Sequence, residues 1–194
     1  MTVKRCSWAN SSALLKRYHD EEWGKPTHDD RQLFEMLILE GKSCGLSWEI
    51  ILKKRDRLRS AFDNFEPNIL ITYDDAKIDA LMQDPGIIRH RLKAQAVVEN
   101  ARAYLKLKES YGSLDNFLQN YASNQPSQHN AFPKIIIRNE TSDRLSKDLR
   151  KFGFKFVGST IIYSFMQAVG IVDDHEPDCF ASKTIGDAVC AILQ

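Results

Sequence analysis

The stretch Asp84-Pro85-Gly86-Ile87-Ile88-Arg89-His90-Arg91-Leu92-Lys93 lies between two segments with helical periodicity and predicts a helix–turn–helix unit. A short helix is expected over 74–83 and a long helix over about 88–109. Backbone N–H groups at the start of the second helix, with basic side chains close by, suit a phosphate group. A tight packing turn with solvated arginines explains the same residues about as well, so the stretch alone leaves both interpretations open.

Outward from this turn, most of the chain has the pattern of amphipathic helices. Helices are predicted over 29–45, 47–62, 114–121, 142–152 and 158–168, and the last of these is apolar on nearly all sides and should lie centrally. Ser47 is the expected N-cap of the second helix in this series.

Three stretches do not fit the helical pattern. The β-like stretches 135–137 and 152–157 have no hairpin partner, so we interpret them as extended connections. The polar segment 123–133, which carries two prolines, is the expected boundary within the fold. The predicted fold class is all-α.

Length and composition are those of a globular protein. The chain has 194 residues, of which 43% are hydrophobic and 27% charged, which fits one domain and argues against disorder. No apolar run approaches the ~20 residues of a membrane span, and the first residues lack a signal-peptide core, so a cytoplasmic protein without a membrane partner is expected. In that compartment disulfides are improbable, and Cys44 and Cys190 are expected to be plain core or surface thiols.

Two pairs of potential metal ligands stand near opposite ends of the chain. His175 and Cys179 form an H-x3-C pair, and Cys6 and His19 are separated by twelve residues. A Cys2His2 set suits tetrahedral zinc, and four protein ligands would leave no open position, so such a site would be structural and would join the termini. The spacing alone is a weak signal, because an H-x3-C pair also arises by chance.

One carboxylate interrupts the apolar face of the helix predicted over 29–45. A carboxyl group placed like that of Glu40 should have a raised pKa unless it meets a donor or a cation, and such groups cluster at functional sites. Trp48 opens the next helix and Tyr18 lies upstream, so aromatic side chains could form a slot for a flat ligand such as a base. Alternatively, Glu40 lies at the margin of the stripe with its head in solvent. Trp8 and Trp23 are expected to be core residues.

A basic run extends from Lys53 to Arg59, and further basic residues follow at Arg150, Lys151 and Lys155. Because a charged helix face is usually only solvated, the run carries little weight as a nucleic-acid site by itself. The net charge of +1, from 27 basic and 26 acidic residues, also argues weakly against binding through bulk positive potential.

Nine short segments of the chain follow one another in an order known from one protein family. They are Arg5-Cys6-Ser7-Trp8, Tyr18-His19-Asp20-x-Glu22-Trp23-Gly24, Leu33-Phe34-Glu35-Met36, Leu39-Glu40-Gly41, Gly45-Leu46-Ser47-Trp48, Gly86-Ile87-Ile88-Arg89-His90-Arg91, Asn100-Ala101-Arg102-Ala103-Tyr104, Phe152-Gly153-Phe154-Lys155-Phe156-Val157-Gly158 and Tyr163-Ser164-Phe165-Met166-Gln167-Ala168. In this order and over nearly the whole chain, the segments resemble the 3-methyladenine DNA glycosylase I family.

The resemblance implies a helix-hairpin-helix glycosylase fold in a single domain over 1–194. One lobe, with the hairpin, would span about 29–121, and the second would combine 1–28 with 142–194. Carried over by position, a structural Zn2+ would be held by Cys6, His19, His175 and Cys179. Glu40, as the catalytic residue, would read the edge of a flipped adenine, Trp48 would stack on it, and Tyr18 would be a neighbouring aromatic. The DNA backbone would be held by the hairpin residues Gly86, Ile87, Ile88, Arg89, Arg91 and Lys93.

The activity so implied is hydrolytic release of 3-methyladenine from alkylated double-stranded DNA by a monomer, without strand cleavage. Leu15 stands where some members have an aromatic residue, and the tail 180–194 does not match the short, cysteine-rich tails of some members. Two alternatives stay open: a zinc-stabilised DNA-binding module without chemistry, and a hydrolase with catalytic zinc. If DNA is the partner, the near-neutral net charge indicates modest, salt-sensitive affinity through few phosphate contacts.

Overall fold

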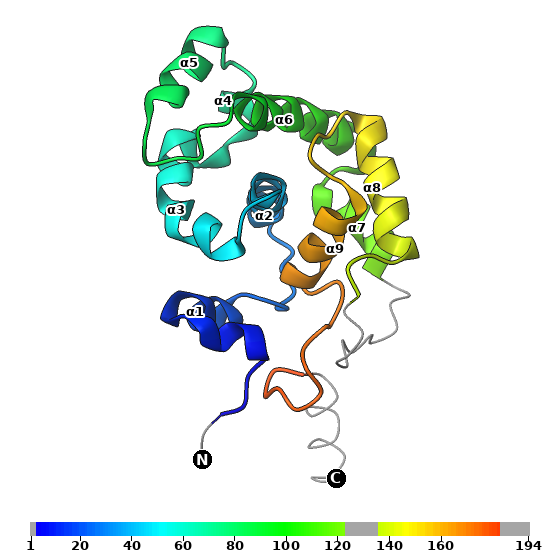
Figure 1. Ribbon diagram of the computed structural model, residues 1–194. Helices are drawn as coiled ribbons and strands as arrows, with labels where there is room; N and C mark the ends of the chain where they lie inside the picture. The colour runs from blue at the N-terminus through cyan, green and yellow to red at the C-terminus, as the bar shows by residue number, and fades with distance from the viewer. Residues whose placement is uncertain (1–2, 123–135, 183–194) are drawn as a thin grey trace.

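In the computed structural model, which describes residues 3–122 and 136–182, every regular element in these ranges is a helix (Figure 1). The prediction of an all-α protein is therefore confirmed. The α-helices are α1 (Ala13–Glu21), α2 (Asp30–Ser43), α3 (Trp48–Ala61), α4 (Pro67–Leu70), α5 (Asp75–Gln83), α6 (Arg91–Tyr111), α7 (Leu114–Ala122), α8 (Glu140–Phe152) and α9 (Ser159–Ala168). Two short 3-10 helices, η1 (Ser7–Ser11) and η2 (Asp63–Phe65), precede α1 and follow α3.

Helix α2 is the centre of the arrangement, and it contacts α3, α6, α7 and α9 (Figure 1). Its residues from Met36 to Lys42 are all buried, because neighbouring helices cover it on several sides. The Asp29 carboxylate caps the helix by accepting the backbone N–H groups of Arg31 and Gln32. Gly41 favours a close approach here: a Cβ atom would lie 3.2 Å from Cβ and 3.3 Å from the carbonyl oxygen of Phe156, which packs against the helix.

The capping residues explain why several helix bounds followed from the sequence. Ser47 caps α3, as predicted, and Asp74 caps α5. Helix α8 begins at Glu140, two residues before the predicted start, because Asn139 and Ser142 form a reciprocal capping box. The stretch 152–157 contains no strand, in agreement with its interpretation as a connection after α8.

The sequence placed the start of one helix too early and missed α1 and η1. Helix α6 starts at Arg91 rather than at residue 88, because the turn extends to His90, whose extended backbone and ring nitrogen cap the helix by accepting the Lys93 N–H. Helix α1 and η1 were not predicted, although Leu14, Leu15 and Tyr18 of α1 have helical spacing. Yet α1 brings Tyr18 and His19 into the interior.

The predicted boundary at 123–133 and the tail with Cys190 lie outside the described residues, apart from Phe180, Ala181 and Ser182 of the tail. Among the described helices, none is both long enough and apolar enough to cross a membrane.

Candidate active site

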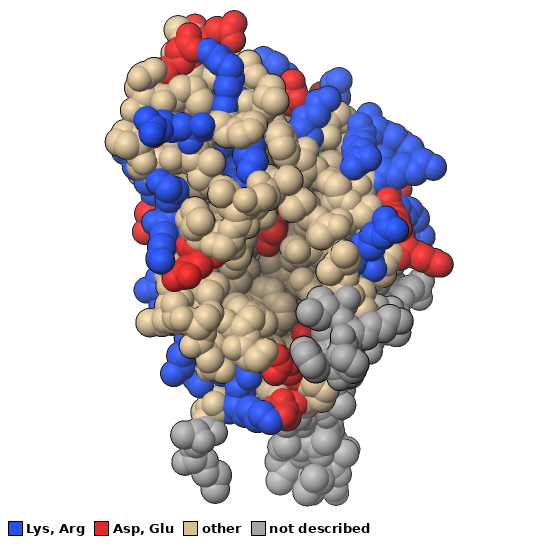
Figure 2. All heavy atoms as spheres, viewed as in Figure 1, with Lys and Arg blue, Asp and Glu red and all other residues tan. Residues whose placement is uncertain are grey.

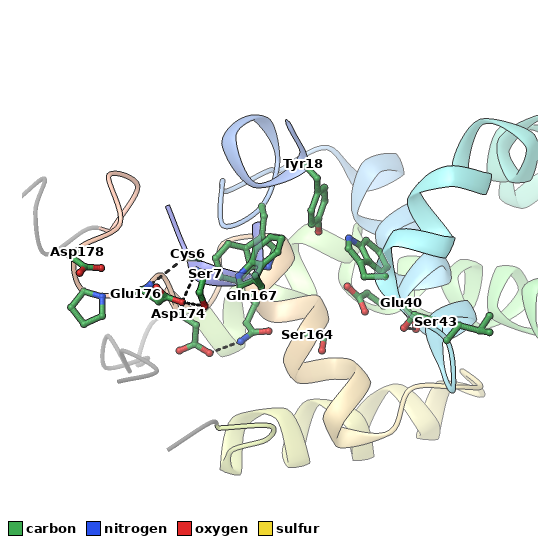
Figure 3. Close-up of a pocket in the computed structure, with 15 residues that line it drawn as sticks. Cys6, Ser7, Tyr18, Glu40, Ser43, Ser164, Gln167, Asp174, Glu176 and Asp178 are labelled. Carbon is green, nitrogen blue, oxygen red and sulfur yellow. Dashed lines mark hydrogen bonds between the residues drawn. The ribbon is translucent and has the colours of Figure 1, made fainter. Parts of the chain in front are cut away.

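A cavity of about 900 Å³ opens between η1, α1, the end of α2, the start of α3, α9 and the segment 174–178 (Figure 3). Figure 2 shows the face that carries a central hollow with mostly uncharged walls, while Lys and Arg side chains gather around its margins. The residues that matter for its chemistry are Trp8, Tyr18, Trp23, Glu40, Trp48 and Gln167.

Glu40, on α2, lies in the wall of this cavity with only 5% of its surface exposed. Its carboxylate has no hydrogen-bond or ion-pair partner within residues 3–122 and 136–182. Burial removes the carboxyl group from water and raises its pKa to about 8. The alternative of a Glu40 head group in solvent is therefore wrong.

Tyr18 and Trp48 face the same cavity, and their ring centroids are 5.5 Å apart at an interplanar angle of 52°. The Tyr18 hydroxyl and the Trp48 indole N–H are buried, and neither finds a hydrogen-bond partner in the described part of the chain. Burial, and then the charge of Glu40, hold the pKa of Tyr18 well above its usual range. Because buried polar groups are rarely left unpaired, the three side chains together point to a ligand that would pair with them.

Trp8 and Trp23 are more than core residues. Both are half-buried and pack against the core, but both also line the cavity, with ring centroids 5.1 Å apart in an edge-to-face arrangement. Ser164 and Gln167 of α9 line it too and were missed. Their signal was available, since they are polar residues three positions apart, and so on one face, of an otherwise apolar helix. Leu15 is not among the lining residues described.

Three of the four expected metal ligands come together where the ends of the described chain meet. Ligand atoms of Cys6, His19 and Cys179 all lie within 4.8 Å of one another, and all three residues are buried. The Cys179 Sγ atom lies 3.4 Å from Nε2 of His19. The other ring nitrogen of His19, Nδ1, lies 2.9 Å from the Asp20 carboxylate.

The fourth expected ligand, His175, lies beside this group, with its ring centroid 5.4 Å from that of His19. Its Nδ1 atom lies 2.7 Å from the Asp173 carboxylate, while its Nε2 atom is buried with no hydrogen-bond partner among the described residues. Gly24 makes room for this ring, since a Cβ atom there would lie 2.5 Å from Cε1 of His175. A metal ion is one way to satisfy the buried nitrogen.

Helices α5 and α6 and the turn 84–90 form the helix–turn–helix unit expected from the sequence (Figure 1). The Gly86 N–H donates to the Asp84 carboxylate at 2.8 Å, and the Ile87 N–H donates to the Asp84 carbonyl at 3.4 Å. Arg89 and Arg91 are exposed, and Arg91 forms an ion pair with Asp79 of α5. Ile88 is half-buried.

Two of the residues expected to bind DNA have buried side chains. The Lys93 side chain is buried, and its Nζ atom donates to the carbonyl oxygens of Lys42, at 2.9 Å, and Cys44, at 2.5 Å. It therefore satisfies the C-terminal end of α2 instead of facing solvent. The Ile87 side chain is also buried, in the core.

In the described part of the chain, helices surround an aromatic cavity whose wall carries a buried carboxylate without a partner there, an arrangement that suits a flat ligand with positive charge or hydrogen-bond donors. A sequence profile of the methyladenine glycosylase family matches residues 8–182. The chain therefore belongs to the methyladenine glycosylase family.

Relatives and solved structures agree with this assignment. The chain is 45% identical over 179 residues to DNA-3-methyladenine glycosylase 1 of Escherichia coli K12, covering 91% of this chain and 96% of the relative. It is 42% identical over 177 residues to DNA-3-methyladenine glycosylase of Haemophilus influenzae, covering 90% and 96%. A crystal structure of 3-methyladenine DNA glycosylase I superposes with a TM-score of 0.87 at 45% identity, over 92% of this chain and all of that one. The Staphylococcus aureus enzyme, studied for its recognition of 3-methyladenine, gives a TM-score of 0.87 at 38% identity over 92% and 96%.

Proposed function

We propose that this protein is a DNA glycosylase that releases 3-methyladenine from alkylated double-stranded DNA. The observation that carries the proposal is the buried, unpartnered carboxylate of Glu40 beside Trp48 and Tyr18, at the wall of a cavity that a flipped base can enter. Methylation at N3 places a positive charge on adenine and so makes the base a better leaving group. The relatives at 42–45% identity are named for this activity.

Selectivity for the damaged base follows from charge. A cationic base beside Glu40 favours the ionised carboxylate and so lowers the pKa that burial has raised. Neutral adenine carries no positive charge, so when it enters the cavity an ionised Glu40 carboxylate stays buried without a counter-charge. Stacking of the cation on Trp48 adds about 0.5–2 kcal/mol. Extruding the nucleotide costs a few kcal/mol, and less for a damaged base.

The chemical step is hydrolysis. The glycosidic C–N bond breaks and its electron pair goes to the base, which becomes neutral. Water adds to the sugar carbon and loses a proton to solvent. Among the described residues that line the cavity there is no lysine, which supports water as the nucleophile and a reaction without a Schiff base or strand cleavage.

DNA would be held by the turn between α5 and α6. Ile88, Arg89 and Arg91 would contact the backbone through N–H groups and guanidinium groups at the start of a 21-residue helix, and Gly86, whose N–H donates to Asp84, would shape the turn. Lys93 is left out of this set, since its Nζ atom already bonds two carbonyl oxygens.

A structural Zn2+ held by Cys6, His19, His175 and Cys179 is also part of the proposal. Two thiols and two imidazoles are donors that tetrahedral zinc prefers. Each histidine bonds an aspartate through Nδ1 and leaves Nε2 for the metal, an arrangement common around zinc-bound histidines. The ion would join the two ends of the described chain and would take no part in the chemistry.

The zinc proposal predicts about one equivalent of zinc per chain by elemental analysis. We expect Cys179→Ser to lose most of the metal and to lower the melting temperature, because zinc binding energy contributes to folding. Cys44→Ser, at an exposed thiol, is the matched control and should keep the metal. Metal-free protein of full stability would contradict the proposal. Spectra of cobalt-substituted protein showing an open coordination position would favour the alternative of a catalytic metal.

The activity is tested by incubating methylated duplex DNA with the protein and separating the released bases by chromatography. Wild type should release 3-methyladenine, Trp48→Ala should lose at least tenfold in rate, and Trp48→Phe should retain part of it, because it keeps a stacking face. Binding of methylated DNA without any base release would favour the DNA-binding module without chemistry.

The remaining proposals concern organisation. We propose one domain of two lobes, one over about 29–121 and one from 1–28 with 142–194, acting as a monomer in the cytoplasm. In this division the two lobes would meet where α2 contacts α9 and α6 contacts α8. Size-exclusion chromatography with light scattering tests the monomer.

A further inference from the structure

The basic run of α3, Lys53 to Arg59, is more than a solvated face. Lys53 pairs with Glu49 of the same helix at 2.9 Å. Arg55 bonds Glu22, just after α1, at 2.5 Å and Glu35 of α2 at 2.8 Å. Arg59 also pairs with Glu35, at 2.7 Å. Arg55 and Arg59 are thus engaged with carboxylates outside α3, while Lys53 is exposed and pairs within its own helix.

The other two basic residues of the run, Lys54 and Arg57, are three positions apart and reach the turn between α5 and α6. The Lys54 Nζ atom donates to the carbonyl oxygens of Gly86, at 2.9 Å, and Pro85, at 3.2 Å. Arg57 donates from Nε to the Asp84 carboxylate at 2.8 Å. The other oxygen of that carboxylate accepts the Gly86 N–H at 2.8 Å, so both sides of the Gly86 backbone are fixed from α3.

The fit between α3 and the turn is close. A Cβ atom on Gly86 would lie 2.7 Å from Cγ of Arg57 and 3.0 Å from the Asp84 carboxylate. The turn can therefore approach α3 this closely only with glycine at position 86. Lys54 also neutralises two carbonyl oxygens that would otherwise present partial negative charge beside a bound phosphate.

The same helix carries the aromatic wall of the cavity. Trp48 is the first residue of α3, and Lys54 follows it by six residues, which is about 9 Å along a helix. Arg55 meanwhile ties α3 to the carboxylates of Glu22, just after the helix of Tyr18, and of Glu35, on the helix of Glu40. One rigid element thus connects the turn to all three side chains that face the ligand.

We propose that Lys54 and Arg57 are positioning residues: they fasten the DNA-binding turn to α3 and so set the distance between the held phosphate and the base cavity. The inference rests on the proposed function, in which the turn holds DNA. Without this attachment the turn still binds a phosphate, but the damaged nucleotide arrives displaced from Trp48 and Glu40. Small displacements of a reacting group are costly for rate.

The test compares Lys54→Met with Lys53→Met, which removes the same charge one residue away, from a side chain that pairs only with Glu49 in the described part of the chain. Single-turnover release from methylated duplex is measured at saturating DNA, so that differences in affinity drop out. We expect Lys54→Met to be about tenfold slower than wild type and Lys53→Met to stay within twofold. Binding of free 3-methyladenine, followed by tryptophan fluorescence, should be unchanged in both, which shows an intact cavity. Equal rates for the two variants would overturn the inference.

Arg57→Met provides a second test if Lys54→Met fails to bind free base, because the Arg57 side chain is 57% exposed and its replacement should not disturb folding. Its saturated rate should fall about threefold, and a rate equal to that of wild type would overturn the inference. Failure of the proposed function looks different: wild type would release no base, or Arg89→Ala would leave DNA affinity unchanged.

Discussion

Two charged residues on α2, Glu40 and Lys42, are both almost fully buried, at 5% and 2% exposure, yet they lie in different surroundings. Glu40 borders the cavity of about 900 Å³, whereas Lys42 borders a void of about 10 Å³ and its Nζ atom lies 4.2 Å from the ring centroid of Phe62. Burial raises the pKa of Glu40 to about 8, and burial followed by the charge of Lys93 lowers that of Lys42 to about 7. A perturbed pKa is thus common to both, and only access for a ligand separates the functional group from the structural one.

The largest expected effect is on activity. Glu40→Gln should lower single-turnover release of 3-methyladenine by about a hundredfold or more, because a neutral amide cannot favour the cationic base. Lys42→Met, two residues away, should change this rate less than threefold. The measurement is base release from methylated DNA at saturation, with thermal melting to verify folding. If Lys42→Met were as inactive as Glu40→Gln, the distinction between the two residues would be wrong.

A second effect concerns the stability of the ligand-free protein. The pKa of Glu40 is about 8 in the folded state and near 4.5 in the unfolded state. At pH values between these two, the folded protein keeps the proton on Glu40, whereas the unfolded chain has released it. Stability should therefore fall as pH rises from about 5 to 8, by about 2–4 kcal/mol from this residue. Urea unfolding of wild type and Glu40→Gln across this range measures it, and the variant should lack this part of the decline. Glu99→Gln, at an exposed site on α6, should behave like wild type.

The smallest effect is expected from the buried lysine. Lys42→Met keeps the aliphatic stem and removes a charge without a hydrogen-bond partner in the described chain, so it should stabilise the protein at pH 7 by about 1–2 kcal/mol. Burial lowers the pKa of Lys42, so as pH falls from about 10 to 7 this lysine is protonated in the unfolded chain before it is protonated in the folded protein. Wild type therefore loses stability as pH falls through this range. The advantage of the variant should therefore shrink as pH rises through this range. A constant difference in urea unfolding, equal to that of the exposed control Lys106→Met, would contradict the assignment.

The sequence predicted most of what local rules control and little of what depends on long-range packing. A cap such as Ser47 acts within four residues, so it could be found by inspection. Glu40 stood out because it breaks an apolar stripe on its own helix. Helix α1 was missed although Leu14, Leu15 and Tyr18 have helical spacing, and the burial of His19 depends on partners far along the chain, such as Cys179.

Contacts across the molecule also explain the residues that were assigned differently. Lys93 was grouped with the DNA contacts because of its neighbours in sequence, but it bonds carbonyl groups about fifty positions away. Trp8 and Trp23 were expected in the core. They do pack against it, but they also form part of the cavity wall. The roles of Arg55 and Arg59 depend on carboxylates of other helices, which no local pattern reveals.

The internal use of the basic residues on α3 has a consequence for how the protein searches a genome. With Arg55 and Arg59 paired to carboxylates and Lys54 and Lys93 bonded to carbonyl groups, these four basic residues add little to counterion release from DNA. Residence on undamaged duplex should be short, and a short dwell time lets one molecule sample many sites. Binding of the flipped, charged base in the cavity then lengthens the residence time at a damaged site.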